Sequence, residues 1–152
     1  PRHPRYYIAT MEPFGAEGRA RVEKHRNMRA DKQFETIECY TSLASVRLPR
    51  RGAVLLECLG NLSANELYSP AGAGSRPEAF AAIVDGVDAL LGQCDELVVV
   101  GNEVFAGGNQ YAEGTEDYLR LMADVNRALA KRADRVCEVV CSLPRYYKGA
   151  AR

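Results

Sequence analysis

The sequence predicts an α/β fold in which a mostly parallel β-sheet carries helices on both faces. Short apolar runs alternate along the chain with longer stretches whose apolar residues recur at helical spacing. Two of the runs, 53–59 and 96–101, are almost wholly apolar, which is typical of strands covered on both faces of a parallel sheet. No internal repeat or low-complexity segment interrupts the alternation, so we expect the 152 residues to form one three-layer domain.

The first half of the chain is expected to contain three strands and one helix. Residues 5–10 (RYYIAT) are β-branched and aromatic and precede a loop with proline and glycine, which predicts a strand. Residues 16–29 contain strong helix formers and few apolar side chains, which predicts a solvated helix. In 34–39 (FETIEC) apolar and polar residues alternate, as in a strand with one exposed face. The apolar run 53–59 is the third strand.

Two helices should follow the third strand. The first is short, over 59–67, and a loop over 69–76 ends it. The second begins near Pro77, a favoured first-turn residue, and its apolar side chains up to Leu91 recur at helical spacing.

The last part of the chain repeats the alternation. The run 96–101 predicts a strand, and an apolar stripe over 118–129 predicts a helix with Thr115 as its N-cap. Residues 135–141 (RVCEVVC) are a third candidate for a strand of the parallel sheet.

The composition excludes several classes of protein. Lys and Arg total 20, as do Asp and Glu, and this net charge of zero argues against bulk binding of nucleic acid or of an anionic membrane surface. No apolar run approaches the roughly 20 residues of a membrane-spanning helix. The five cysteines form no C-x-x-C pair and only two histidines are present, which argues against a structural zinc site. Reduced thiols inside apolar runs indicate a cytoplasmic protein.

Polar residues stand where the predicted strands end. Ligands of open parallel sheets bind beyond the carboxyl ends of the strands, which here are followed or ended by Thr10, Glu57, Asn102 and Glu103. A carboxylate at such a position can hold a metal ion bound to phosphates or accept a hydrogen bond from a hydroxyl. It can equally cap the helix that follows, and the sequence leaves both interpretations open.

The helix predicted over 16–29 carries a second candidate site. Arg21, His25 and Arg29 are spaced four residues apart and fall on one face. An imidazole nitrogen is a competent nucleophile toward phosphorus, and guanidinium groups beside it would hold phosphate oxygens. From the chemistry alone, a surface histidine on a charged helix is the simpler interpretation.

Six short segments favour the functional interpretation of His25, because they occur in the order found in one enzyme family. The segments are 7–10 (YIAT), 21–29 (RVEKHRNMR), 36–38 (TIE), 55–59 (LLECL), 100–104 (VGNEV) and 125–127 (VNR). Together they resemble adenosylcobinamide kinase/adenosylcobinamide-phosphate guanylyltransferase, a bifunctional family of cobalamin biosynthesis. Each segment alone is weak evidence, and their shared order carries the resemblance.

The resemblance implies a three-layer fold like that of the P-loop NTPases (RecA-like), with 1–152 as a single nucleotide-binding domain. It also implies two transferase reactions. A nucleoside triphosphate, ATP or GTP with Mg²⁺, phosphorylates adenosylcobinamide, and GMP then passes from GTP to adenosylcobinamide phosphate through a guanylylated histidine. His25 occupies the position of that histidine. The family forms trimers, so a homotrimer is expected.

The resemblance also implies a set of nucleotide-binding residues. Glu57, which ends an apolar strand, is the candidate for organising Mg²⁺ or the ribose. The full set of residues expected to border the nucleotide is Ile8, Ala9, Thr10, Arg26, Asn27, Met28, Arg29, Glu38 and Glu57.

The sequence departs from the family pattern in three places, one of which is Ala30, where the family has a proline after the helix. The family begins with a strand and a G-G-x-x-S-G-K-S phosphate-binding loop, which 1–152 lacks, so we expect that the chain lacks its N-terminal strand and P-loop. Residues 105–111 (FAGGNQY) replace the family's G-x-G-I-V-P-E, which puts the corinoid specificity in question. The alternatives are a non-catalytic nucleotide- or corinoid-binding paralogue and, less favoured, an unrelated P-loop ATPase.

Overall fold

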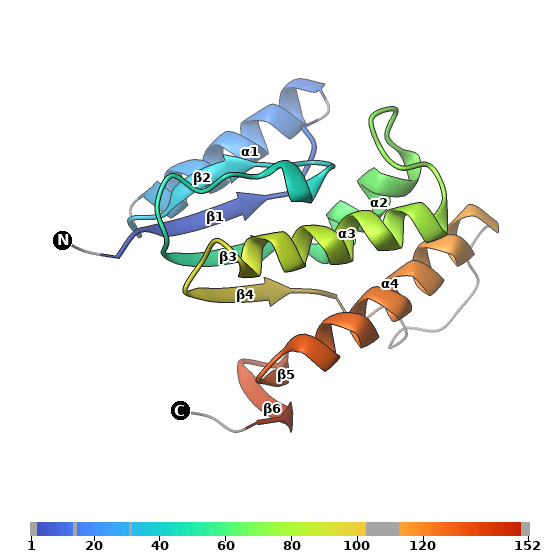
Figure 1. Ribbon diagram of the computed structural model, residues 1–152. Coiled ribbons are helices and arrows are strands. Elements are labelled where there is room, and N and C mark those ends of the chain that lie inside the picture. Colours follow the sequence, from blue (N-terminus) through green and yellow to red (C-terminus); the bar gives the residue numbers. More distant parts are fainter. Residues whose placement is uncertain (1–2, 14, 31, 103–112, 150–152) are drawn as a thin grey trace.

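The computed structural model describes residues 3–13, 15–30, 32–102 and 113–149. Its main sheet has four parallel strands in the order β2-β1-β3-β4 (Figure 1). The strands are β1 (Arg5–Ala9), β2 (Glu35–Glu38), β3 (Ala53–Glu57) and β4 (Glu96–Val100). The predicted parallel α/β sheet is confirmed.

Within the described residues, three α-helices and one 3₁₀ helix lie between these strands along the chain, as parallel pairing requires, and a fourth α-helix follows β4. They are α1 (Gly15–Ala30), η1 (Leu43–Ser45), α2 (Leu59–Tyr68), α3 (Arg76–Leu91) and α4 (Glu113–Arg132). Most of the described side chains of α1 are exposed, which confirms the solvated helix. Among the described residues, no helix is long and apolar enough to cross a membrane.

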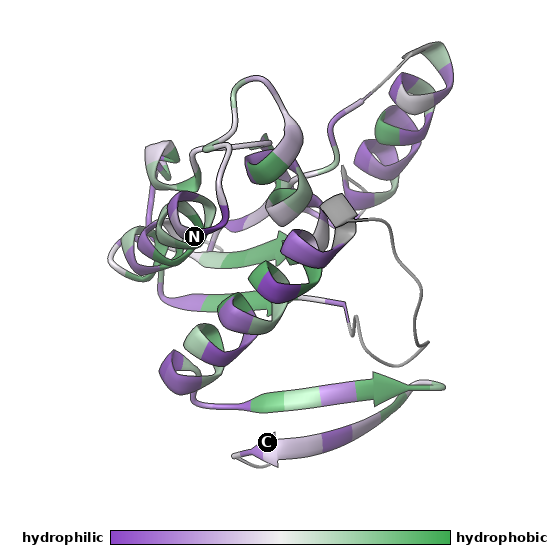
Figure 2. Cartoon of the chain, turned by 90° about the vertical axis from the view of Figure 1, so that its right-hand side faces the viewer, coloured by the Kyte–Doolittle hydropathy of each residue, from purple (hydrophilic) through white to green (hydrophobic). Residues whose placement is uncertain are grey.

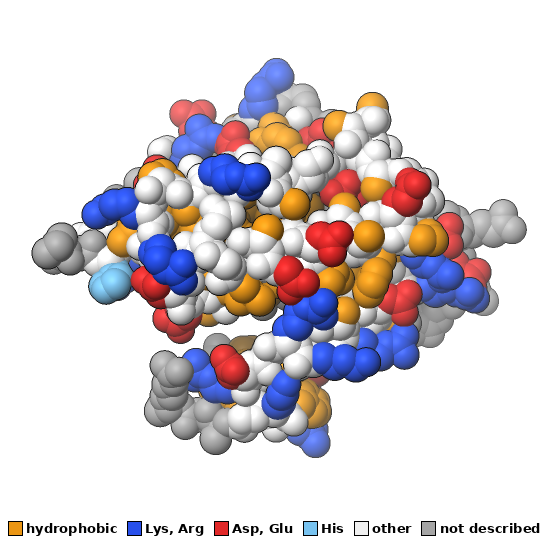
Figure 3. Space-filling view, in the orientation of Figure 1, with side chains coloured by type: hydrophobic (Ala, Val, Ile, Leu, Met, Phe, Trp, Pro, Cys, Tyr) orange, Lys and Arg blue, Asp and Glu red, His pale blue; other side chains and the backbone are white. Residues whose placement is uncertain are grey.

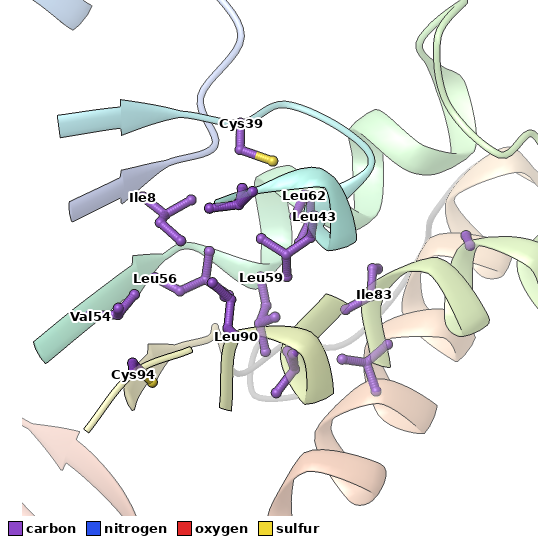
Figure 4. Close-up of a cluster of buried hydrophobic side chains, with 14 of the residues drawn as sticks. Ile8, Cys39, Leu43, Val54, Leu56, Leu59, Leu62, Ile83, Leu90 and Cys94 are labelled. Atoms are coloured by element: carbon purple, nitrogen blue, oxygen red, sulfur yellow. The ribbon is translucent and has the colours of Figure 1, made fainter. Parts of the chain in front are cut away.

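The core lies on one face of the sheet, between the strands and α3. Side chains alternate along a strand, so Tyr6 and Ile8 of β1 point to this face together with Leu56 of β3. They pack with Ile83 and other apolar residues of α3 (Figure 4). The helix α1 covers the opposite face of β1 and β2, so the sheet has helices on both faces, as predicted.

The segment 135–141 was expected in the parallel sheet, and this prediction is wrong. Strand β5 (Val136–Val140) instead pairs antiparallel with β6 (Leu143–Lys148). Cys141 and Ser142 adopt φ angles of 50° and 65°, the left-handed pair that forms a two-residue hairpin turn and reverses the chain. Figures 1 and 2 show the hairpin set apart from the main sheet, at the end of α4.

Two predicted boundaries also need correction. Helix α4 begins at Glu113, so Thr115 lies inside its first turn rather than at the N-cap. The strand predicted over 53–59 ends at Glu57, because Cys58 is the N-cap of α2 and its Sγ accepts a hydrogen bond from the Asn61 backbone N–H. The strand-end residue Glu57 therefore stands directly before a helix.

Charged side chains of both signs are interspersed over the face of the molecule in Figure 3, in keeping with the net charge of zero. This face offers no single-sign surface of the kind that binds nucleic acid electrostatically.

A buried carboxylate ties two loops to α2. Glu66 is only 2% exposed, and its two oxygens accept hydrogen bonds from the backbone N–H groups of Ser42 and Ala73, both at 3.0 Å. One of these groups precedes η1 and the other precedes α3. The buried side chain thus supplies an acceptor to a backbone donor in each of two loops.

We expect Glu66→Gln to lower the free energy of unfolding by about 1–3 kcal/mol, because the buried amide NH₂ would face a backbone N–H donor. Urea unfolding measures the difference. Glu35→Gln is the matched control, since Glu35 is exposed and its substitution should change stability little. Equal stabilities of the two variants would contradict this role of Glu66.

Candidate functional site

Two carboxylates flank a small residue at the carboxyl ends of three strands. Ala9 of β1 is in register with Glu38 of β2 on one side and with Glu57 of β3 on the other. Register partners in a parallel sheet point to the same face, and neighbouring strands lie about 4.8 Å apart. The methyl group of Ala9 therefore leaves a gap between two acidic side chains.

Helix α1 covers this gap with two basic side chains. Val22, His25 and Arg29 recur at helical spacing on the face of α1 that meets the sheet, and all three line a cavity of about 70 Å³. We call it the phosphate-sized cavity. Its lining residues are Tyr7, Ala9, Thr10, Met11, Val22, His25, Arg29, Glu38, Glu57, Cys58 and Asn61.

The guanidinium group of Arg29 is held on two sides. Its central carbon lies 3.9 Å from the centroid of the Tyr7 ring, and its Nε donates a hydrogen bond of 3.4 Å to Oγ1 of Thr36. Tyr7 and Thr36 are register partners on β1 and β2, so strand pairing places both contacts. The Tyr7 ring in turn meets Phe34 edge to face, with centroids 6.4 Å apart. The arrangement orients Arg29 over the sheet.

The hydroxyl of Tyr7 faces the carboxylate of Glu57. Burial, and then the negative charge and hydrogen bonding of Glu57, raise the pKa of Tyr7 to about 12, although the nearby Arg29 acts in the opposite direction. The phenol therefore keeps its proton at physiological pH and can donate it in a hydrogen bond to Glu57. Tyr7, Arg29 and Glu57 form one connected group in the cavity wall.

Thr10 lines the cavity and fixes the chain where β3 ends and α2 begins. It is fully buried, and its hydroxyl donates to the carbonyl of Cys58 at 2.9 Å and accepts from the N–H of Cys58 at 2.8 Å. The side chain of Asn65 donates to the carbonyl of Thr10 at 2.8 Å. These bonds hold the junction of β3 and α2, where the positive end of the α2 dipole lies next to Glu57.

A larger depression of about 380 Å³ adjoins the phosphate-sized cavity. It is lined by Arg26, Phe34, Thr36 and Glu38, so Glu38 belongs to the walls of both. Arg26 and Glu38 form an ion pair across it, and their side chains are 50% and 34% exposed. A pair so accessible to solvent adds little stability, so a ligand can replace it at small cost.

The structure brings together six of the residues expected at the site. His25, Ala9, Thr10, Arg29, Glu38 and Glu57 line the phosphate-sized cavity, and Arg26 lines the depression beside it. Three others lie elsewhere. The side chain of Ile8 points into the core on the opposite face of the sheet, and Asn27 and Met28 are exposed on α1.

Two further sequence expectations differ from the geometry. Arg21 was expected to share a face with His25 and Arg29, but it is exposed and Val22 takes its place in the cavity wall, because the buried face of α1 follows the 22, 25, 29 spacing. Asn102 is exposed, whereas Glu103 and the segment 105–111 lie outside the described residues.

Five lining residues were not predicted, and the sequence could have revealed three of them, two through periodicity and one through its position after Glu57. Tyr7 stands two residues before Ala9 and so shares its strand face, and Val22 precedes Arg29 by two helical turns. Asn61 lies in the first turn of the helix that follows Glu57. Met11 and Cys58 are loop and junction residues, for which the sequence carries no comparable signal.

The acidic groups fit one kind of metal binding. No group of three or more His, Cys, Asp or Glu side chains that could hold a metal ion occurs within 3–13, 15–30, 32–102 and 113–149. A single carboxylate such as Glu57 suits Mg²⁺ that is bound mainly by phosphate oxygens and water. The site therefore fits Mg²⁺ brought by a nucleotide.

Comparison with known protein families gives a match over residues 1–146, to the family described as cobinamide kinase / cobinamide phosphate guanyltransferase. The match covers nearly the whole chain. No curated protein matches the sequence.

We expect Glu57→Gln to lower the pKa of Tyr7 from about 12 toward its ordinary value of 10, because the negative charge that disfavours the phenolate is removed while burial remains. The chemical shift of the Tyr7 ζ carbon, followed by NMR from pH 9 upward and assigned with Tyr7→Phe, measures this pKa. Glu38→Gln is the matched control, because it removes the other carboxylate of the cavity. An unchanged Tyr7 titration in Glu57→Gln would contradict the connected group.

Proposed function

The chain belongs to the cobinamide kinase / cobinamide phosphate guanyltransferase family, and on this basis we propose that it transfers GMP from GTP to adenosylcobinamide phosphate through a guanylyl group on His25. The membership makes the protein a transferase of cobalamin biosynthesis. The observation that carries the finer proposal is the position of His25 beside Arg29 on the one face of α1 that lines the phosphate-sized cavity.

The transfer takes place in two displacements. A nitrogen of the His25 imidazole attacks the α-phosphorus of GTP, an N–P bond forms, and the bond to the leaving pyrophosphate breaks. An oxygen of the phosphate on adenosylcobinamide phosphate then attacks the same phosphorus, the N–P bond breaks, and the free imidazole is restored. A covalent intermediate allows one site to serve two acceptors in turn.

The other groups of the cavity suit the charges of this reaction. Arg29 offers the terminal amino groups of its guanidinium to phosphate oxygens, a geometry for which arginine is well adapted. Glu38 and Glu57 are exposed carboxylates that can accept hydrogen bonds from ribose hydroxyls or from base N–H groups. When bound, Mg²⁺ supplies positive charge to the phosphates, and Glu57 is the residue that would hold it.

The sizes of the two spaces support a divided binding site. The cavity of about 70 Å³ is well below the size range of small-molecule pockets, so we assign it to a phosphate rather than a nucleoside. The depression of about 380 Å³ is within the range of small-molecule pockets and adjoins it through Glu38. We place the α-phosphate between His25 and Arg29, and the nucleoside along Arg26 and Phe34.

The remaining expected residues fit this placement in different ways. Ala9 and Thr10 line the cavity and Ile8 lies in the core beneath them, whereas Asn27 and Met28 would contact only parts of the nucleotide that extend past α1. Phosphorylation of adenosylcobinamide by ATP or GTP is proposed on the family description alone. A homotrimer remains a prediction from the resemblance.

We expect the full chain, incubated with α-labelled GTP and Mg²⁺, to acquire a label that is labile in acid and stable in alkali, as a phosphoramidate is. His25→Ala should abolish the label. His3→Ala is the matched control, because His3 is the other histidine of the sequence and lies outside the cavity. Equal labelling of His25→Ala and the parent would exclude His25 as the nucleophile. Nucleotide binding without labelling of the parent would favour the non-catalytic alternative.

We expect Glu57→Gln to leave the melting temperature close to that of the parent and to slow turnover by about 10²-fold, the effect of losing one charge-stabilising group. Thermal melts and steady-state kinetics of Glu57→Gln distinguish a catalytic role of Glu57 from capping of the helix that follows it. Glu96→Gln, at the amino end of β4, is the control. A lowered melting temperature with normal turnover would show that Glu57 is only a structural carboxylate.

A further inference from the structure

We propose that Tyr7 is a positioning residue of the nucleotide site, whose ring holds the Arg29 guanidinium in place to receive a phosphate group. The inference rests on the proposed function, because it names the residue that prepares one of its phosphate ligands. Tyr7 begins the motif segment 7–10, but neither that segment nor the strand-end rule assigned its side chain a role, which is recognised from its contacts.

The first argument is the geometry of the Arg29 side chain. The ring of Tyr7 packs against one face of the guanidinium, with 3.9 Å between the ring centroid and Cζ of Arg29. The Nε of Arg29 donates a hydrogen bond to Oγ1 of Thr36. Both contacts use parts of the group other than the pair of terminal amino groups. Those two groups form the fork that binds phosphate oxygens. Neither the ring contact nor the Nε bond uses this fork, and the Tyr7 hydroxyl adds a further interaction with Arg29.

The second argument is the charge of the partner. A carboxylate paired with Arg29 would neutralise it and compete with an incoming phosphate. An aromatic face attracts the cation through its quadrupole and carries no net charge. Arg26 offers the contrast on the same helix, because it is paired with Glu38. Of these two arginines, Arg29 is the one held by a ring and left with its charge available.

The third argument is the rigidity of Tyr7 itself. It lies on β1, which is paired with β2 on one side and β3 on the other, opposite Thr36 and Leu55. Phe34 meets the edge of its ring, and its hydroxyl faces Glu57. A ring fixed by two strands and two neighbouring side chains can fix the flexible side chain of an arginine, which lowers the entropy lost when a phosphate binds.

The ring and the hydroxyl can be tested apart. Tyr7→Phe keeps the ring under Arg29 and removes the hydroxyl, with its contacts to Glu57 and to Arg29. Tyr7→Leu removes the ring and keeps an apolar side chain on the strand. We expect calorimetry on the full chain to show GTP affinity about tenfold weaker in Tyr7→Leu. The GTP affinity of Tyr7→Phe should be close to that of the parent. Loss of affinity in Tyr7→Phe equal to that in Tyr7→Leu would overturn the proposal.

A double-mutant cycle with Arg29→Met gives the decisive readout. If Tyr7 acts through Arg29, then Tyr7→Leu should weaken GTP binding in the parent and have almost no effect in the Arg29→Met background. If Tyr7 only packs the sheet, the two effects add, and the proposal is overturned. Urea unfolding of each variant verifies that the affinities compare folded proteins.

A ligand-free measurement supports the same cycle. The guanidinium NMR signals of Arg29 should be displaced by the ring current of Tyr7, and the displacement should persist in Tyr7→Phe and vanish in Tyr7→Leu. No displacement in the parent would overturn the proposal. If His25 is labelled normally by GTP but the effects of Tyr7→Leu and Arg29→Met add, only the proposed role of Tyr7 is excluded. If the two effects do not add but His25 is not labelled, only the proposed guanylyl transfer is excluded. Absence of GTP binding in the parent overturns both.

Discussion

The parallel pairing of β1 between β2 and β3 is the constraint on which the site depends. It brings three strand ends to one edge of the sheet and puts Ala9 between Glu38 and Glu57. The same pairing places Tyr7 opposite Thr36, and these two side chains hold Arg29. A shift of one residue in the register would turn this entire set to the opposite face. Packing on that opposite face, where Ile8 and Leu56 are fully buried, keeps the register fixed.

The charges of the cavity are balanced in a way that suits a nucleotide. Arg29 and His25 come from α1, and the two carboxylates come from strand ends below it. In the proposed placement, the helix supplies groups for phosphate, and the sheet supplies acceptors for hydroxyls and a ligand for Mg²⁺. Because the acidic and basic groups belong to different elements, the approach of α1 to the sheet sets the distance between them.

Much of the fold and part of the site could be predicted from the sequence. The strand-end rule found Glu57 and Thr10 because apolar runs mark buried strands clearly, and helical spacing related His25 to Arg29. The hairpin of β5 and β6 was missed because an apolar run has the same appearance in parallel and antiparallel pairs. Its direction depends on the turn at Cys141, where neither turn residue is glycine or asparagine. Tyr7 could not be assigned a role, since its function depends on contacts with a side chain 22 positions away in the sequence.

The central claim, that His25 becomes covalently bonded to the α-phosphorus of GTP, can be tested by phosphorus NMR. The full chain, labelled with ¹⁵N at histidine and supplied with GTP and Mg²⁺, should give a phosphoramidate ³¹P resonance coupled to an imidazole ¹⁵N, together with an equal amount of pyrophosphate. The resonance should be retained in His3→Ala and absent from His25→Ala. Release of pyrophosphate without a coupled ³¹P resonance, or a resonance that survives in His25→Ala, would contradict the account.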